Sequence, residues 1–471
     1  MSEQTLTVDA YQLTTLIAHA DAGRLEQHMA MTAFFRKLPV NRGYVVACGQ
    51  RSIVEHARQM RVTKEEFDVL FTHPIIGERL RSRPAIVSAL SALDGFVGEI
   101  DAVPEGLPVF AGPGRRSDGT PLLVDGRPLT LYAPLLSIRT DMLLAKMIET
   151  PWLSRLNHQS MVASKASRVV IAAKGKPVLE FGARRTQTQA GIDAAWAAAV
   201  AGCTGTSNMA AWMRYGIPAV GTMDHSFVQA SEEPGLSTDE SERRAFAAFH
   251  ATYGASATYL VDTYDTVRGI RNAVRASNKQ LGGIRIDSNV TVATVAQARA
   301  LLDELGAPHA KIIVSDGLDE MKVARLDGAD GFGVGEQITC SPDSATGVGA
   351  VAKLTVNGYG RATMKLSRGS AKMTLPGRIA AWRYADHDLV AIDGEAVPAG
   401  GRALLEPLWR GRGPVVEEPA AAALHRAHAV CRRELAALPA GVRDLASPEP
   451  YPLVASDALV DLVSSRVKEA A

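Results

Sequence analysis

Short apolar runs alternate with helical patterns through the middle of the chain. The runs are 178–181, 219–221, 258–261, 283–286, 311–314 and 331–334. Between them, Ser237 and Glu240 have the spacing of a capping box before a helix over 239–253, and a helix over 292–305 is expected to stop at Gly306. This alternation predicts a parallel sheet, either open or closed into a barrel.

The two flanks of this region are patterned differently. Residues 8–51 indicate a helix followed by a strand-like segment, and the turn-rich residues 110–132 predict hairpins. Residues 135–168 carry apolar positions at helical spacing. After Cys340 the pattern is strand-like again, and a stretch rich in glycine and proline at 397–414 precedes a helical tail.

Polar side chains end nearly every apolar run of the middle region. They are Arg184 and Arg185, Asp224 and His225, Asp262, Arg285 and Asp287, and Ser315 with Asp316 and Gly317. In a βα barrel the carboxyl ends of the strands meet at one mouth. The pattern therefore predicts a single polar site at that mouth.

Composition and charge narrow what this site can bind. The 471 residues carry 51 Lys and Arg against 50 Asp and Glu, which gives a formal net charge of +1. This balance provides no overall attraction to nucleic acid or to anionic membranes. An anionic substrate must therefore be captured by a local cluster of cations or amides.

The cysteines and the apolar runs argue against several other classes of protein. The four cysteines are widely spaced and form no CxxC pair, so neither a structural zinc site nor a disulfide framework is expected. The first residues are polar, unlike a signal peptide, and no apolar run approaches the length of a membrane span. The expectation is a cytoplasmic enzyme.

At these strand ends the sequence resembles the nicotinate phosphoribosyltransferase family, which belongs to the type II phosphoribosyltransferases. The matching motifs include Asp9-Ala-Tyr11-Gln-Leu-Thr14, Glu149-Thr-Pro151, Phe181-Gly-Ala-Arg184-Arg185, Gly205-Thr-Ser-Asn208, Gly221-Thr-Met-Asp-His225-Ser226, Arg285-Ile-Asp-Ser288 and Gly333-Val-Gly335. They follow the family's order, and the resemblance covers nearly the whole chain.

The resemblance implies a fold and an assembly. It implies an α/β fold with an irregular, incomplete parallel βα barrel over 161–340, which holds the active site. A β-rich flanking domain would be built from residues 1–160 and 341–400, and residues 401–471 would form a helical C-terminal extension. Members of the family work as homodimers with shared active sites.

The resemblance also implies a reaction in NAD salvage. Nicotinate and phosphoribosyl pyrophosphate would give nicotinate mononucleotide and pyrophosphate, with Mg²⁺ and ATP as the cofactors. The pyridine nitrogen is unprotonated near neutral pH, so no general base is needed. The protein must position the substrates and stabilise the charge on the departing pyrophosphate. No metal site made by the protein alone is predicted.

The expected substrate contacts come from several motifs. Arg184 and Arg185 suit a carboxylate and a phosphate, although salt bridges at a surface or interface are the alternative. By resemblance, Phe181 and a partner subunit's Tyr11 would sandwich the pyridine ring, whereas core packing is the usual fate of aromatic side chains. Ser207 stands where nicotinamide-using relatives carry aspartate, so an acid substrate is not repelled; its other possible role is to cap the next helix.

The expected catalytic residues lie at two strand ends. His225 stands where the family places a histidine that accepts a phosphoryl group from ATP and loses it to water. Asp224 replaces the alanine common before it, and would orient the imidazole or slow phosphoryl attack. Arg285 and Asp287 would bracket the ribose, with Asp287 on its hydroxyls or on magnesium, or they would only brace the barrel. Relatives usually carry a second acid at the position of Val290.

Backbone amides complete the expected site. Ser315, Gly317, Gly333 and Gly335 offer N–H groups before helix starts, where phosphate binds well. Tight turns are the other explanation for these glycines, and their place on two late strands favours the 5′-phosphate. The later Arg383, taken singly, is expected to be a solvated charge.

Two further functions stay open at this point. The departures at Asp224 and Val290 allow a divergent paralogue that phosphoribosylates another aromatic acid. A catalytically silent binding protein that kept the pocket is the third hypothesis. The near-complete set of polar strand ends, including His225, argues against that hypothesis.

Overall fold

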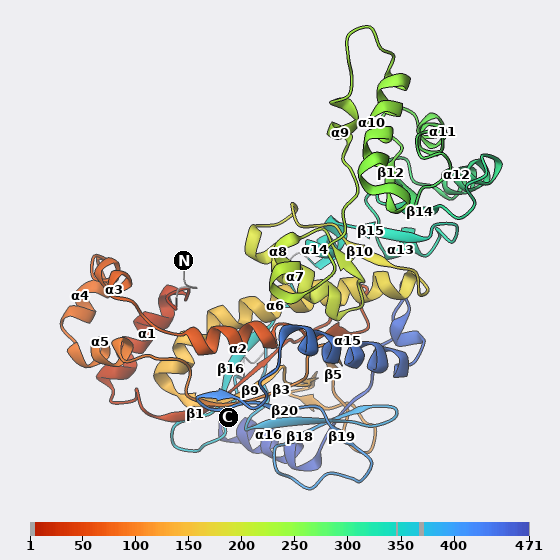
Figure 1. Cartoon of the computed structure of the whole chain (residues 1–471). Helices are drawn as coiled ribbons and strands as arrows, with labels where there is room; N and C mark the ends of the chain where they lie inside the picture. Colours follow the sequence, from red (N-terminus) through yellow and green to blue (C-terminus); the bar gives the residue numbers. More distant parts are fainter. Residues whose placement is uncertain (1–4, 345–346, 367–371, 471) are drawn as a thin grey trace. The chain divides into compact units, whose positions relative to one another are not determined.

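The computed structural model describes residues 5–344, 347–366 and 372–470, and its elements are labelled in Figure 1. Contacts group the chain into two compact units. The first unit comprises Met1–Met161, Thr346–Pro419 and Ala429–Ala471, and the second comprises Val162–Ala345 and Ala420–His428. The three-part domain division drawn from the resemblance stays a prediction.

The second unit is built on one parallel sheet with the strand order β11-β10-β15-β14-β13-β12. The strands are β10 (Val178–Glu180), β11 (Gly205–Thr206), β12 (Thr258–Leu260), β13 (Gly283–Ile286), β14 (Lys311–Val314) and β15 (Gly331–Val334). Within the described residues no pairing joins the edge strands β11 and β12. The incomplete parallel barrel is therefore confirmed.

One predicted strand of this sheet is reduced to a single bridge. The apolar run at 219–221 pairs only through Ala219, opposite Thr206. Thr206 N donates to Pro218 O at 2.9 Å and Val220 N donates to Thr206 O at 2.8 Å. Because β11 ends at Thr206, the run finds no further backbone partners there.

Helices connect the strands of the second unit. They are α7 (Thr188–Val200), α8 (Met209–Tyr215), α9 (His225–Gln229), α10 (Thr238–Tyr253), η1 (Gly254–Ser256), α11 (Thr266–Ala276), α12 (Val292–Glu304), α13 (Glu320–Val323), α14 (Glu336–Thr339) and η2 (Pro342–Ser344). Two predicted boundaries are confirmed. Ser237 Oγ accepts from Glu240 N at 3.2 Å before α10, and Gly306, with φ +81°, follows α12.

Two sheets organise the first unit. One has the order β16-β1-β9-β3-β20-β21, and the other has the order β19-β17-β18-β22. Their strands are β1 (His28–Phe34), β3 (Gly98–Ala102), β9 (Leu136–Asp141), β16 (Val351–Val356), β17 (Ile379–Arg383), β18 (Asp388–Ile392), β19 (Arg402–Ala403), β20 (Glu406–Gly411), β21 (Gly413–Pro414) and β22 (Leu453–Ala455). The pairing of β1 with the edge strand β16 joins the N-terminal segment to the segment after the barrel, as predicted.

Three small ribbons complete the strands of the first unit. They pair β2 (Val45–Val46) with β4 (Pro108–Val109), β5 (Ala111–Pro113) with β8 (Thr130–Tyr132), and β6 (Leu123–Val124) with β7 (Arg127–Pro128). The hairpins predicted over residues 110–132 are therefore confirmed. The strand β1, by contrast, was not predicted, because its sequence HMAMTAF is rich in residues that favour helices. Pairing on both edges and nearly complete burial override that propensity.

The remaining helices belong wholly or partly to the first unit. They are α1 (Ala10–Asp21), α2 (Gln50–Gln59), α3 (Lys64–Leu70), α4 (Ile76–Arg81), α5 (Pro84–Ser91), α6 (Met142–Ala172), α15 (Ala420–Ala437), η3 (Gly441–Arg443) and α16 (Asp457–Glu469). The helical pattern predicted from residue 135 begins later, because the first residues of that segment form β9 between β1 and β3. Among the residues described, no helix has both the length and the apolar character of a membrane span.

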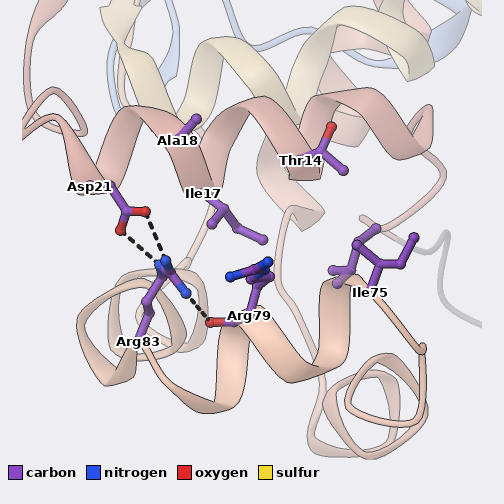
Figure 2. A pocket seen from close by; sticks show the side chains of 8 residues that line it. Thr14, Ile17, Ala18, Asp21, Ile75, Arg79 and Arg83 are labelled. Carbon is purple, nitrogen blue, oxygen red and sulfur yellow. Dashed lines mark hydrogen bonds and ion pairs between the residues drawn. The ribbon is translucent and has the colours of Figure 1, made fainter.

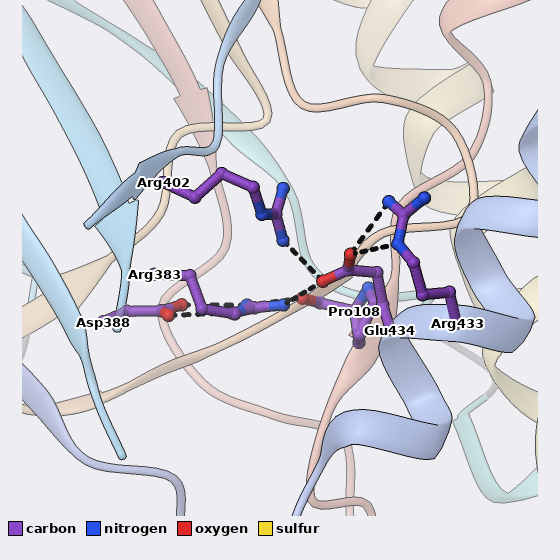
Figure 3. A network of polar contacts seen from close by, with 6 residues as sticks. All are labelled: Pro108, Arg383, Asp388, Arg402, Arg433 and Glu434. Atoms are coloured by element: carbon purple, nitrogen blue, oxygen red, sulfur yellow. Dashed lines mark hydrogen bonds and ion pairs between the residues drawn. The ribbon is translucent and has the colours of Figure 1, made fainter. Parts of the chain in front are cut away.

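Arg383 in β17 lies in a buried network of charges (Figure 3). Its guanidinium group donates to the two carboxylate oxygens of Asp388 at 2.9 and 3.0 Å, and to Glu434 Oε2 at 3.4 Å. Arg402 and Arg433 donate to Glu434 from the exposed side of the network. The Arg383 side chain is 10% exposed, so the expectation of a solvated charge is wrong. The sequence alone does not show that Asp388 pairs with it across β17 and β18.

Replacing Arg383 is expected to destabilise the first unit strongly. Arg383→Ala leaves the fully buried Asp388 carboxylate without its cation, and breaking a buried pair in this way costs about 3–5 kcal/mol of unfolding free energy. Chemical denaturation monitored by circular dichroism measures the loss. Arg402→Ala is the matched control, because it also removes a cation from Glu434 but at a half-exposed position, where the expected cost is about 1 kcal/mol or less. Equal losses for the two variants would contradict this assignment.

Candidate active site

Four of the predicted residues meet at the carboxyl ends of β13 and β14. Ser315 Oγ donates to Asp287 Oδ1 at 2.6 Å, and Arg285 Nη2 lies 3.4 Å from Asp287 Oδ2. His225 Nε2 lies 3.9 Å from the same Oδ2 atom. We call His225, Arg285, Asp287 and Ser315 the Asp287 cluster. Its carboxylate is 29% exposed, so a substrate can reach it.

The imidazole of His225 is oriented by a threonine rather than by the preceding aspartate. His225 Nδ1 lies 3.1 Å from Thr263 Oγ1, which follows β12. Asp224 Oδ1 instead accepts hydrogen bonds from Ser226 Oγ and Phe227 N, both at 2.8 Å, and so caps α9. The bond from Ser226 lowers the pKa of Asp224, so this cap is a carboxylate near neutral pH.

Arg285 is fixed by the loop that leads to His225. Its Nη1 donates to Thr222 Oγ1 at 2.9 Å and to Met223 O at 3.4 Å. The side chain is 17% exposed, and the two contacts leave its Nη2 beside Asp287. The loop with the histidine and the strand with the arginine are thereby held in one arrangement.

Asp262 supports the cluster from the neighbouring strand end. Its Oδ2 accepts from Asp287 N at 2.8 Å and from Ser288 Oγ at 2.6 Å, while its Oδ1 is buried and finds no hydrogen-bond partner among the described residues. Magnesium that arrives on a substrate's phosphates needs only one or two protein carboxylates. The orphaned oxygen of Asp262 and the carboxylate of Asp287 fit such an ion. No group of three or more potential ligands for a metal occurs in the described part of the chain.

A carboxylate also lies beside the position of the missing second acid. Val290 N donates to Asp316 Oδ2 at 3.4 Å. Asp316 comes from the loop after β14, whereas Val290 comes from the loop after β13. The neighbouring strand end therefore supplies negative charge next to Val290.

The turn after β10 places Phe181 against Gly333, within β15, and Gly335, directly after it. A Cβ atom added to Gly333 would lie 2.4 Å from two ring carbons of Phe181, and one added to Gly335 would lie 3.0 Å from Phe181 O. Phe181 N donates to Val334 O at 2.9 Å. The Gly-Val-Gly segment therefore makes room for the aromatic ring, which is an explanation that the sequence did not offer.

The two arginines of this turn point to solvent and are available to an anion. Arg185 Nη1 lies 3.9 Å from Glu336 Oε2, and both side chains are about half exposed. Arg184 is exposed and forms no ion pair with any described residue. Neither guanidinium group is committed to a buried structural pair.

Ser207, at the end of β11, is exposed and does not cap the helix that follows. That cap is Asn208, whose Oδ1 accepts from Ala210 N at 3.0 Å and from Ala211 N at 3.3 Å. Ser207 therefore leaves a neutral hydroxyl group at this strand end.

The loop after β14 combines a tight turn with a cation. Gly317 has a φ of +49°, so the turn itself favours glycine there. Gly317 O accepts from Lys322 Nζ at 2.9 Å, and Lys322 is a residue that the sequence analysis missed. It lies in the short helix α13 directly after the loop, so a search for cations downstream of each strand end would have found it.

Tyr11 belongs to the first unit, whereas all other predicted site residues belong to the second. The residue is 51% exposed, and its hydroxyl group donates to Glu149 Oε1 at 3.4 Å. Burial of the hydroxyl group and the charge of Glu149 raise the pKa of Tyr11. The structure thus rules out full core packing for this ring, and its role in a substrate site stays a prediction.

A cavity of about 260 Å³ in the first unit is not part of this site (Figure 2). It is lined by Thr14, Ile17, Ala18, Asp21, Ile75, Ile76, Arg79 and Arg83. Arg83 donates to both carboxylate oxygens of Asp21, at 2.7 and 2.8 Å, so these two charges at the edge of the cavity satisfy one another. It is smaller than the roughly 300–1,000 Å³ typical of ligand sites, and we assign it to helix packing.

An incomplete parallel barrel with polar residues at the carboxyl ends of its strands is the architecture of an α/β enzyme. The chain belongs to the nicotinate phosphoribosyltransferase family, whose model matches residues 177–367. It is 34% identical to nicotinate phosphoribosyltransferase pncB1 of Mycobacterium tuberculosis (strain CDC 1551 / Oshkosh), over 94% of this chain and 93% of that protein. The human nicotinate phosphoribosyltransferase is 28% identical over 98% of this chain and 96% of its own length.

Solved structures agree with this assignment. The crystal structure of human nicotinic acid phosphoribosyltransferase matches with a TM-score of 0.78 and 25% identity, covering 98% of this chain and 99% of that one. A nicotinate-nucleotide pyrophosphorylase from Pyrococcus furiosus shares the fold with a TM-score of 0.68 and 23% identity, over 92% and 95% of the two chains. The predicted family and fold class are both confirmed.

Gly333→Ala is expected to weaken the binding of a flat aromatic acid. The new methyl group would displace the Phe181 ring, and the loss of an aromatic contact corresponds to about a three- to tenfold loss of affinity. Isothermal titration with nicotinate measures the effect. Gly112→Ala is the control, because nothing lies within 4 Å of its added Cβ atom. Unchanged affinity in a folded Gly333→Ala protein would show that the Phe181 ring does not contact the ligand.

Proposed function

We propose that this protein is a nicotinate phosphoribosyltransferase that converts nicotinate and phosphoribosyl pyrophosphate to nicotinate mononucleotide and pyrophosphate in NAD salvage. The observation that carries the proposal is the Asp287 cluster, in a chain that belongs to the family. The pyridine nitrogen bonds to the ribose C1 atom while the bond from C1 to the pyrophosphate oxygen breaks. The electron pair of the broken bond leaves with pyrophosphate.

The nicotinate end of the site is formed by the turn after β10 and the end of β11. The Arg184 guanidinium group pairs with the substrate carboxylate, and the Phe181 ring supports the pyridine face. Ser207 is neutral and exposed, so it adds no charge that would repel an acid. These three side chains select an aromatic acid over the corresponding amide.

The ribose and phosphate end is formed by the Asp287 cluster and the arginines. Asp287 is held by Ser315 and faces Arg285, so it can accept hydrogen bonds from the ribose hydroxyls in a fixed position. Arg185 and Arg285 stabilise the charge that develops on pyrophosphate. Ser315 N donates to Ile286 O at 2.9 Å and Gly333 lies within β15, so the expectation that their amides are open to phosphate is not met. The backbone amides of Asp316, Gly317 and Gly335 are our proposed site for the 5′-phosphate. Magnesium, when bound, would neutralise pyrophosphate charge beside Asp262 and Asp287.

We assign the coupling to ATP to His225. A nitrogen of its imidazole forms a bond to the γ-phosphorus of ATP as ADP leaves, and water later breaks that bond to release phosphate. Thr263 holds Nδ1, so the ring has one preferred orientation before the transfer. The family's use of a histidine at this position supports the assignment.

A second candidate is a paralogue that acts on another azaaromatic acid. It is favoured by Val290, where relatives usually carry an acid, and by Asp224, which here caps α9. Asp224 and Val290 belong to the loops of the proposed ribose and phosphate end, not to its nicotinate end. The proposed contact of Arg184 with the substrate carboxylate is therefore the same in the two candidates.

Turnover with labelled ATP tests the proposal. Nicotinate is expected to give the highest kcat/KM in a panel of azaaromatic acids that includes nicotinamide, and γ-labelled ATP is expected to leave an acid-labile phosphate on the chain. His225→Ala should abolish the label, because no other residue is assigned to accept it. His250→Ala should keep the label, because His250 Nδ1 lies 3.0 Å from Tyr259 Oη and the residue is not part of the Asp287 cluster. Preferred turnover of another acid would select the paralogue, and binding without turnover would select the silent binding protein.

We also propose a cytoplasmic homodimer whose subunits share their active sites. The face of α8 next to Ser207 exposes large apolar side chains, with Met209 57%, Trp212 49% and Met213 78% exposed, and Tyr11 is half exposed. Apolar side chains that gather on one surface are typical of protein interfaces. The free cysteines favour a reducing compartment.

Mixed dimers test the shared site. Tyr11→Ala and Arg184→Ala chains are each expected to be inactive alone, because each lacks one side of every pyridine site. Random mixing of the two should restore about a quarter of wild-type activity, since half of the dimers would have one intact site of two. Steady-state rates after co-refolding or co-expression measure the recovery. Failure to recover activity, in preparations shown to contain mixed dimers, would contradict the shared site.

A further inference from the structure

Glu180, the last residue of β10, has a carboxylate that the reaction does not use directly. Its side chain is fully buried, with 0% of the residue exposed. It accepts hydrogen bonds from Gly182 N, from Thr339 Oγ1 at 2.9 Å and from Thr206 Oγ1 at 2.6 Å. It forms no ion pair with any described residue, so donors rather than a cation surround the charge. One carboxylate therefore joins the turn after β10, the end of β11 and the end of α14.

One branch of this arrangement reaches Ser207. Thr206 Oγ1, which donates to Glu180, also accepts from Asn208 N at 3.0 Å. Ser207 lies between Thr206 and Asn208 in the sequence, and its own N–H group donates to the main-chain oxygen of Glu180 at 2.9 Å. Glu180 thus holds the backbone of Ser207 directly and through both of its neighbours.

The other branch holds the turn that carries Phe181 and Arg184. Glu180 Oε1 accepts the Gly182 amide and the Thr339 hydroxyl group together. A Cβ atom on Gly182 would lie 1.8 Å from Thr339 Oγ1, so the turn and α14 approach as closely as glycine permits. The Phe181–Arg184 turn is therefore fixed against α14 by the same carboxylate that binds the Thr206 hydroxyl group beside Ser207.

We propose that Glu180 is a positioning residue for the aromatic acid, acting through the turn after β10 and the end of β11 and not through contact with substrate. The proposal rests on the proposed function for the identity of that acid. Holding both segments in one geometry before binding removes an ordering cost that would otherwise weaken affinity. The predicted effect is confined to the nicotinate end, because no bond of Glu180 reaches the Asp287 cluster.

A direct electrostatic role makes the opposite prediction. If the buried negative charge of Glu180 acted on the substrate itself, it would repel nicotinate, and removing the charge would tighten binding. If Glu180 acts by position, removing the charge weakens binding. The direction of the change in the KM for nicotinate therefore distinguishes the two roles.

Glu180→Gln is the variant that tests the proposal. Its amide keeps the shape of the side chain but presents an NH₂ group to one of three donors, so one hydrogen bond is lost or reversed. We expect the KM for nicotinate to rise about tenfold, with kcat and the KM for phosphoribosyl pyrophosphate changing less than about twofold. Glu242→Gln is the matched control. Glu242 has the same burial in the same unit, but accepts from Asn272 Nδ2 at 2.8 Å between α10 and α11.

A second readout does not depend on turnover. Amide hydrogen exchange of the substrate-free protein should speed up in the segments 181–187 and 205–211 of Glu180→Gln, and should stay at the wild-type rate there in Glu242→Gln. Thr206→Val should reproduce the faster exchange at 205–211 alone, because it removes only one of the two branches. These exchange rates report how firmly the two segments are held, even in a protein that fails to turn over nicotinate.

The outcomes distinguish a failure of the positioning role of Glu180 from a failure of the proposed function. A KM for nicotinate that falls or stays within about twofold of wild type, together with unchanged exchange, overturns the role of Glu180. An equal loss in all kinetic parameters, matched by Glu242→Gln, also overturns it, since that pattern reports stability alone. A wild-type protein that does not turn over nicotinate overturns the proposed function, while faster exchange in Glu180→Gln would still support positioning of the two segments.

Discussion

The site depends on how the Asp287 carboxylate is held. A carboxylate between an arginine and a histidine would be free to pair with either of them, and its position would then vary with the charge of its neighbours. Here its backbone is anchored by Asp262, and one of its oxygens by Ser315, from the two adjacent strand ends. The remaining oxygen faces Arg285 and His225. Parallel strands make this possible, because their carboxyl ends lie at one edge of the sheet.

The aromatic end of the site is organised by a different constraint, which is close approach. Gly333 gives room to the Phe181 ring and Gly182 gives room to Thr339, so two glycines allow three elements to meet around β10. The buried Glu180 carboxylate then supplies the hydrogen bonds that specify one arrangement. Close packing and a satisfied polar group thus act together, and neither alone would determine where the aromatic ring and the arginines of the turn lie.

The sequence predicts the parts of the structure that depend on local pattern. The runs at 283–286, 311–314 and 331–334 are buried β-branched and glycine-rich strands with polar ends, and the structure has them with the same bounds. The sequence does not predict which polar residues will partner one another, because those contacts depend on the order of the strands in the sheet. Thr263 and Thr339 belong to no motif that the sequence analysis used. The strand β1 was not predicted because its residues favour helices, a preference that sheet pairing overrides.

Strand order also brings a carboxylate beside Val290. Neighbouring parallel strands present their ends side by side, so the same region can receive a side chain from either of two loops. The loop after β13 lacks the second acid, but Asp316 from the loop after β14 brings its carboxylate to the backbone of Val290. A negative charge therefore lies beside Val290 although the motif is altered. A motif read along one segment underestimates what a barrel mouth contains, because the chemistry there is assembled across strands.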